Sequence, residues 1–262
     1  MLSEEIFAYY AEGKERDRLQ RGLGVLEFAR TREVLEPLLP NAPATVYDIG
    51  GGTGPYARWL VEKGYEVHLL DAAPLHVEMA QEIPGLASAV HGDARSLPFT
   101  DASADAVLLL GPLYHLTERT DRMQALKEVA RVLRPNGRVF AAGISRAAQA
   151  LVGARRGWFE EGFLSFVQEQ IASGVHKTPP TRPDLFTTAY FHRPAELSEE
   201  VREAGFEVGG LVGLERPGWT VPDFEVAVTE PDKRERLLTL ARILESIPDL
   251  SPHILAWGSK RG

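Results

Sequence analysis

The chain of 262 residues contains no cysteine. This absence excludes disulfide frameworks, thiolate zinc sites, iron–sulfur clusters and cysteine nucleophiles. No apolar run reaches the roughly 18 residues that a membrane-spanning helix needs, and the first residues lack the pattern of a signal peptide. The net charge of −8 does not favour a phosphate backbone as partner. We therefore expect a cytoplasmic protein that does not bind membranes, and the charge does not favour nucleic acid as its partner, although a local basic groove would still permit it.

The composition is that of an ordinary globular protein. Hydrophobic residues make up 44% of the chain and charged residues 25%, which is not typical of a disordered, collagenous or coiled-coil protein. A chain of this length can bury a large core without covalent cross-links. We predict a single domain spanning residues 1–262.

Short apolar runs alternate with amphipathic stretches through the middle of the chain. This alternation predicts a parallel α/β sheet with right-handed crossovers. The Arg134–Gly137 segment, with its proline, asparagine and glycine, predicts a turn that leads back into a strand. The expected strands are 45–49, 66–70, 88–91, 106–110, 137–142, 206–214 and 253–257, and the expected helices are 55–62, 75–81, 119–132, 194–204 and 233–246.

Two segments depart from this rhythm and divide the chain further. Residues 1–40 are charged and predicted to be helical, whereas residues 145–193 carry many aromatic side chains. These aromatic residues indicate either ordinary core or a lid, because ligands of open α/β sheets bind at the carboxyl ends of the strands. We interpret 1–40 as a cover, 41–144 as the ligand-binding core, 145–193 as a substrate-lid insertion and 194–262 as completion of the sheet.

The most specific motif joins the first expected strand to the first expected helix. It consists of Asp48, Ile49, Gly50, Gly51, Gly52, Thr53 and Gly54. Glycines at such a turn allow positive φ and close approach of the backbone to a ligand, and a helix start favours an anionic group. The spacing alone leaves a dinucleotide and other adenosine ligands open.

Three aspartates near successive strand ends narrow this choice. Asp48 precedes the glycines, and a carboxylate there faces an ammonium group better than a pyrophosphate. Asp71 ends the second strand, in the position of a ribose-hydroxyl acceptor. Asp93 follows the third strand and can accept a hydrogen bond from an exocyclic amine. Together they indicate a ligand with a sugar, an aminated base and a cationic tail.

With these residues, the chain resembles the class I S-adenosylmethionine-dependent methyltransferases of the small-molecule group. The resemblance extends over about residues 45–143 and includes Gly92-Asp93-Ala94, the strand and loop up to Tyr114, and the Val132–Gly137 turn. It implies a doubly wound, Rossmann-like sheet of seven strands, mostly parallel with the last strand antiparallel. It also implies S-adenosylmethionine as cofactor, S-adenosylhomocysteine as product, and no metal.

The resemblance also implies a role for each residue of the cofactor site. Asp48 and the Gly50–Gly54 loop, with Thr53, would hold the methionine end, and Asp71 would accept both ribose hydroxyls. Asp93 would accept from the adenine amine. Small residues would line the ring faces, and the backbone after the fourth strand would close the methionine end; these are Ala72, Ala94, Gly111 and Leu113.

A base is needed only where the methyl acceptor must lose a proton, and histidine has a suitable pKa for that work. His115, in the loop after the fourth strand, is the first candidate, with Tyr114 as an orienting hydroxyl. His192 in the 145–193 insertion is the second. Tyr9, Tyr10 and Arg21 could close over the methionine carboxylate.

Other functions stay open at this point. A non-catalytic cofactor-binding protein would keep the pocket, and an NAD-dependent oxidoreductase would share the glycine spacing and Asp71. An aminopropyltransferase would require an acid where Gly111 stands, and nucleic-acid amino-methyltransferases carry an Asn/Asp-Pro-Pro-Tyr motif there. The acceptor atom and the oligomeric state are not encoded in any motif.

Overall fold

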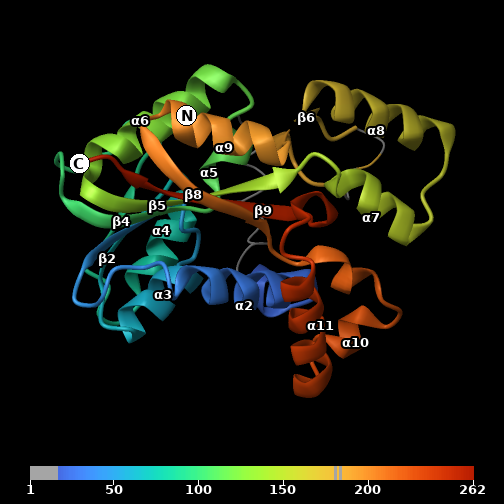
Figure 1. The fold of residues 1–262 in the computed structure, drawn as a ribbon, viewed down its shortest axis with the longest axis horizontal. Coiled ribbons are helices and arrows are strands. Elements are labelled where there is room, and N and C mark those ends of the chain that lie inside the picture. The colour runs from blue at the N-terminus through green and yellow to red at the C-terminus, as the bar shows by residue number, and fades with distance from the viewer. Residues whose placement is uncertain (1–16, 180–181, 183–184) are drawn as a thin grey trace.

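The computed structural model describes residues 17–179, 182 and 185–262. Its centre is a mixed sheet with helices on both faces (Figure 1). The seven main strands follow the order β3-β2-β1-β4-β5-β9-β8, and β1 to β5 are parallel. These are β1 (Thr45–Ile49), β2 (Glu66–Asp71), β3 (Ser88–His91), β4 (Ala104–Leu109), β5 (Leu133–Ser145), β8 (Phe206–Gly213) and β9 (His253–Lys260). The expected doubly wound α/β sheet is thereby confirmed.

Two short strands correct the expected count of seven. β6 (Val175–His176) and β7 (Ala189–His192) bring the described part of the chain to nine strands. β5 continues to Ser145, whereas its last partner on β4 is paired through Ala141. β9 pairs with the other edge of β5. On the edge shared with β4, the last residues of β5 extend past β4, and β7 pairs with them in parallel at Ile144 and Ser145. β6 is antiparallel to β7, so β9 is not the one antiparallel strand that the resemblance implied for the described sheet.

The expected turn at Arg134–Gly137 is also corrected. These four residues belong to β5, where they lie opposite the single residue Asp105, because Ala104 pairs with Leu133 and Ala106 pairs with Arg138. Asn136 adopts the left-handed conformation, with φ of 65°, and Arg134 forms an ion pair of 2.8 Å with Asp105. The strand therefore starts earlier and bulges, where the sequence indicated a separate turn.

The helices begin and end close to the expected positions. The expected helices at 55–62 and 119–132 match the structure fully, and those at 75–81 and 194–204 match within one residue. The expected 233–246 helix starts and stops earlier. The helices are η1 (Arg18–Gln20), α2 (Leu23–Leu35), α3 (Pro55–Glu62), α4 (Pro74–Gln81), α5 (Pro112–His115), α6 (Arg119–Val132), α7 (Ala148–Arg156), α8 (Glu161–Ser173), α9 (Pro194–Glu203), η2 (Arg216–Thr220), α10 (Phe224–Ala227), α11 (Pro231–Ile243) and η3 (Pro248–Leu250).

The sheet separates two hydrophobic cores. Tyr47 and Ile49 of β1 pack with side chains of α6 and α9 on one face, whereas Val46 packs with α2 and α3 on the other. This alternation follows from the two-residue period of a strand, and it leaves the strand ends free to form a site. Within the described ranges, no helix combines the length and the apolarity needed to cross a bilayer.

Candidate functional site: a cavity at the strand ends

A cavity of about 290 Å³ opens at the carboxyl ends of the central strands. The glycine loop, the segments after β2 and β3, the loop after β4, and the η1–α2 region form its walls. Most of the residues expected from the sequence line it: Asp48, Gly50, Gly51, Gly52, Thr53, Asp71, Ala72, Asp93, Ala94, Gly111, Tyr114 and His115. Three residues expected in the cofactor and catalytic sets do not line it: Gly54, Leu113 and His192.

The glycine loop is held by hydrogen bonds to β2 on one side and faces the cavity on the other. The N–H groups of Gly50 and Gly51 donate to the carbonyl of Leu70, at 2.6 and 3.3 Å. Gly50 has φ of 71°, and a Cβ there would lie 2.5 Å from the Pro112 ring. Gly52 has φ of 58°, and a Cβ on it would meet nothing within 4 Å. A ligand can therefore approach this backbone closely.

Asp48 is the most unusual carboxylate of the cavity. The residue is 1% exposed, and its Oδ2 has no hydrogen-bond partner in the described structure. Burial, together with the negative charge of Asp71, raises its pKa from 3.8 to about 7. A buried acceptor without a partner is costly, so a cationic ligand group placed here would be bound favourably.

Asp71 is held in one orientation by three donors. Its Oδ2 accepts from the Gly52 N–H at 2.8 Å, and its Oδ1 accepts from the Ala73 N–H at 2.9 Å. Nδ1 of His76 lies 3.1 Å from the same Oδ1. His76 lines the cavity as well. The carboxylate thus couples the glycine loop to the start of α4.

Asp93 lies in the cavity wall but is tightly engaged by a neighbour. Arg95 donates to Oδ1 from its backbone N–H and Nε, both at 2.9 Å, and to Oδ2 from Nη2 at 2.6 Å. These hydrogen bonds hold the pKa of Asp93 well below its usual range. The same guanidinium also reaches Asp121 at 2.7 Å. Arg95, a cavity residue that sequence reasoning missed, therefore competes for the acceptor expected to meet a base amine.

His115 and Tyr114 lie together in α5, at the cavity side of the loop after β4. Their rings are 4.8 Å apart, and both contact Phe186, at 5.7 and 6.1 Å. Burial lowers the pKa of His115 to about 4, although the charge of Asp71 and a backbone hydrogen bond with Thr188 oppose this. The imidazole is consequently neutral at pH 7, but it is a weaker base than an ordinary histidine. Leu113, in contrast, is fully buried in the core next to α6.

His192 is placed away from the cavity. It is fully buried in β7, and its Nε2 lies 3.3 Å from Oε2 of Glu200. Arg122 donates to the same glutamate at 2.8 to 3.1 Å. Because β7 pairs with β5 beyond the end of β4, His192 is directed toward α9 and does not line the cavity.

The glycine loop ends on a residue with a structural task. Gly54 has φ of 84°, and a Cβ there would lie 2.3 Å from Ile83. It allows α3 to begin close to the segment after α4. Its conformation explains the glycine without a direct ligand contact.

The N-terminal region forms one wall of the cavity. The sequence predicted a cover from this region but not the residues that form it. Tyr9 and Tyr10, named as candidates there, lie outside the described residues, and Arg21 is not part of the lining. No local motif marks the residues that do form this wall, because they meet the cavity only through the packing of α2 on the sheet. They are Arg18, Leu19, Gln20, Glu27 and Phe28.

The 145–193 segment touches the site only through a second layer. None of its described residues lines the cavity, although Phe186 packs against His115 and Tyr114. Part of its aromatic content is core, since Phe191 is 2% exposed, whereas Phe159 is 65% exposed. Its role as a substrate lid stays a prediction.

Residues 47–141 match the family model described as a methyltransferase domain. A demethylmenaquinone methyltransferase of Beutenbergia cavernae is 30% identical over 189 residues, covering 72% of this chain and 70% of that protein. The chain belongs to the methyltransferase domain family. An uncharacterized methyltransferase of Mycobacterium tuberculosis is 34% identical to this methyltransferase-family chain over 161 residues, or 62% of its length. That match spans 61% of the mycobacterial protein, less than two thirds of its length.

A solved structure supports the fold of this methyltransferase-family chain. The complex between the Haloferax volcanii Trm112 methyltransferase activator and a putative methyltransferase contains a chain that superposes with a TM-score of 0.62. The match covers all of this chain and 98% of the other, at 23% identity. At that level of identity the likeness concerns the fold.

Proposed function

We propose that the chain binds S-adenosylmethionine in the strand-end cavity and transfers its methyl group to a small-molecule acceptor, leaving S-adenosylhomocysteine. The observation that carries this proposal is the convergence of Asp48, Asp71 and Asp93 on one cavity with the glycine loop. A zwitterionic ligand with a ribose and an adenine matches this set of donors and acceptors. The family membership and the name of the Beutenbergia relative support the same reaction.

The cavity residues fit this cofactor by their chemistry. Asp48 offers its unpartnered buried oxygen to the ammonium group, and Asp71 offers a rigid carboxylate to the ribose hydroxyls. Asp93 faces the adenine amine, in competition with Arg95, and Ala72 and Ala94 leave room for the flat ring. None of these assignments requires a metal.

When bound, the cofactor supplies a sulfonium-activated methyl group that a nucleophile displaces in line. The task of the protein is then to orient the acceptor and to exclude water, and proximity of this kind can contribute about 7–11 kcal/mol. His115 is neutral at pH 7 and can take the proton of an acceptor hydroxyl or amine, while Tyr114 can orient it. The acceptor enters beside α5, on the side of these two residues.

Calorimetric titration tests the proposal directly. We expect the wild-type protein to bind S-adenosylmethionine and S-adenosylhomocysteine but not NAD. Asp71→Ala should weaken both affinities by roughly tenfold to a hundredfold, because hydrogen bonds to a charged group are worth about 1.5–3 kcal/mol. Asp101→Ala, whose carboxylate pairs at the surface with Arg131, is the matched control and should bind normally.

Three results would contradict the proposal. Binding of NAD alone would indicate an oxidoreductase. An Asp71→Ala variant that binds as tightly as the wild type would show that the ribose is not held at this strand end. Tight cofactor binding with no methylated product across a broad panel of hydroxyl, amine and carbon acceptors would favour a non-catalytic binding protein.

A further inference from the structure

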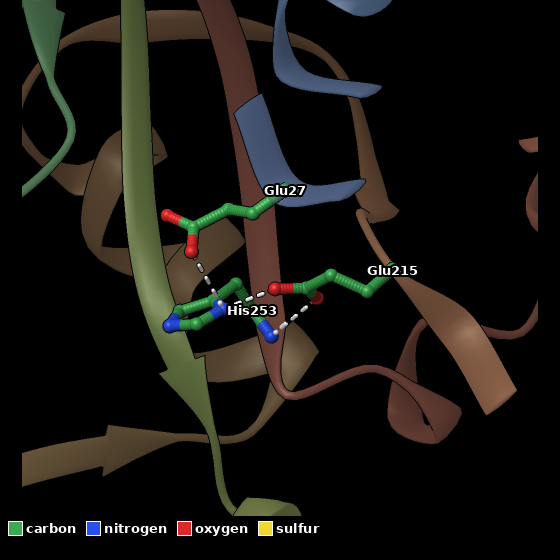
Figure 2. A group of neighbouring side chains, drawn as sticks. All are labelled: Glu27, Glu215 and His253. Atoms are coloured by element: carbon green, nitrogen blue, oxygen red, sulfur yellow. Dashed lines mark hydrogen bonds and ion pairs between the residues drawn. The ribbon is translucent and has the colours of Figure 1, made fainter. Parts of the chain in front are cut away.

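A buried ionic cluster connects the segment after β8 and the start of β9 to the wall of the cavity. It consists of Glu27 on α2, Glu215 after β8 and His253 at the start of β9. Their ligand atoms lie within 4.8 Å of one another, although the three residues are far apart in the sequence. Figure 2 shows the imidazole of His253 lying between the two carboxylates. Arg18 completes the cluster on the cavity side, and both Arg18 and Glu27 line the cavity.

Glu215 is the fixed end of this cluster. It is fully buried, and its Oε1 accepts a hydrogen bond from Nδ1 of His253. Its Oε2 accepts from the Ser251 hydroxyl at 2.7 Å and from the His253 N–H at 3.1 Å. The backbone N–H of Glu215 in turn donates to the Ser251 hydroxyl at 2.9 Å. The carboxylate is therefore tied to the backbone at the start of β9.

Glu27 is the end of the cluster at the cavity. Its Oε2 lies 3.6 Å from Nδ1 of His253, and both of its oxygens accept from the Arg18 guanidinium, at 2.5 and 3.0 Å. The charges therefore alternate from Glu215 to His253, Glu27 and Arg18. Two largely buried carboxylates this close would repel each other strongly without the cation between them.

The charged state of His253 follows from these neighbours. Burial alone would lower its pKa, but the charges of Glu215 and Glu27 outweigh burial and raise the pKa to about 9, while Arg18 opposes them weakly. Burial acts against the ionised Glu27, and Arg18 and His253 together hold the pKa of Glu27 below its usual value. Glu215, Glu27 and Arg18 are the charged groups with the largest effects on the pKa of His253.

Arg18, Tyr56 and Asp48 line the same cavity. The charges of Arg18 and Asp48 both act on the phenol of Tyr56, whose pKa is raised mainly by burial and next by Glu27. If the cofactor's ammonium meets Asp48, its α-carboxylate is therefore within the field of Arg18. The ligand's carboxylate would then follow Arg18 as the next charge in the alternating series.

From this geometry we infer that His253 is a positioning residue for cofactor binding: as an imidazolium held by Glu215, it fixes Glu27 and, through Glu27, the Arg18 cation that faces the cofactor's carboxylate. The inference rests on the proposed function. A divalent metal bound by the same three side chains is the competing interpretation. The structure favours the proton, because Nδ1 of His253 already hydrogen-bonds Oε1 of Glu215 and Arg18 already engages both oxygens of Glu27, so a metal would have to displace both sets of contacts.

The test is the affinity of the full chain for S-adenosylhomocysteine, measured by calorimetry between pH 7 and pH 10.5. His253→Asn keeps a donor toward Glu215 but cannot carry the charge. We expect this variant to bind about fivefold more weakly at pH 8, at the lower end of the usual coupling between sites. In the wild type the affinity should fall by about the same factor as His253 loses its proton above pH 9. The His253→Asn profile records the ligand's own ionisation, so only the difference between the two profiles counts.

Glu215→Gln separates a charge effect from a structural one. Removing the carboxylate that most strongly raises the pKa of His253 should move the alkaline fall in affinity to lower pH. His192→Asn is the matched control, because it removes another buried histidine that pairs with a glutamate but does not reach the cavity. This control should lose stability without any change in the alkaline limb.

The possible failures can be told apart. If the wild type does not bind S-adenosylhomocysteine, the proposed function fails. If it binds but His253→Asn shows the same affinity and the same pH profile, only the positioning role of His253 is refuted. A stoichiometric divalent metal in the purified protein, lost in His253→Asn, would also overturn the inference and establish a metal site.

Discussion

Replacement of Asp48 by asparagine tests the central electrostatic feature of the cavity. In the free protein the pKa of Asp48 is raised to about 7, first by burial and then by the charge of Asp71. A bound ammonium group would favour the ionised carboxylate, so the pKa would fall on binding. Cofactor binding must therefore release a proton from Asp48 whenever the pH lies below about 7.

The magnitude follows from the linkage between the pKa and binding. At pH 6 about nine in ten free molecules carry a protonated Asp48, so the affinity for S-adenosylmethionine should be about tenfold weaker than at pH 8. The Asp48→Asn variant cannot titrate, so its affinity should be weak and nearly independent of pH in this range. Calorimetry in two buffers of different ionisation enthalpy counts the released protons.

As the pH rises, the stability of the free protein should fall while its affinity for the cofactor increases. Because the folded pKa lies above the ordinary value of 3.8, this carboxyl lowers the stability of the free protein as the pH rises from about 4 to about 7. Asp48→Asn should therefore stabilise the free protein at pH 8, by about 4 kcal/mol at most, and have little effect at pH 4. A wild-type affinity that is equal at pH 6 and pH 8, or a destabilised Asp48→Asn protein at pH 8, would refute the reasoning.

Three further predictions concern other parts of the site and its frame. His115→Ala should bind the cofactor normally but turn over slowly, and the acid limb of wild-type kcat should lie well below pH 6.5, because burial lowers the pKa of His115; an unchanged rate would remove His115 as the base. Gly52→Ala should fold, at a cost of about 1 kcal/mol for its positive φ, yet weaken cofactor binding because the new methyl group enters the cavity; unchanged affinity would place the ligand elsewhere. Arg122→Met should lower the stability by about 3–5 kcal/mol, because it leaves Glu200 buried without its cation, whereas Arg119→Ala removes an exposed pair and should cost about 1 kcal/mol or less; equal thermal shifts would contradict this contrast.

The sequence by itself determined the frame of this protein and the centre of its cavity. Strands at 45–49 and 88–91 and helices at 55–62 and 119–132 were predicted to the residue, because periodicity, prolines and glycines act over a few neighbours. The proximity of the three aspartates could also be predicted from the sequence. Parallel strands all end at the same edge, so topology alone places their last residues near one another.

Only the tertiary structure decided which groups act on those residues. The bulge at Arg134–Gly137 depends on the pairing of β5 with β4 on either side of Asp105, and β7 pairs with the part of β5 that extends beyond β4. Neither dependence is visible in a local pattern. The same holds for His192, whose buried partner Glu200 comes from the following helix.

The electrostatics of the site also required the folded chain. Arg95 satisfies Asp93, and Arg18 and Glu27 reach the cavity from η1 and α2, two helices that carry no motif. His253 owes its charge to two glutamates that lie far away in the sequence. A sequence pattern records which side chains are present at the strand ends, but the energy of a buried charge is set by the groups that packing places beside it.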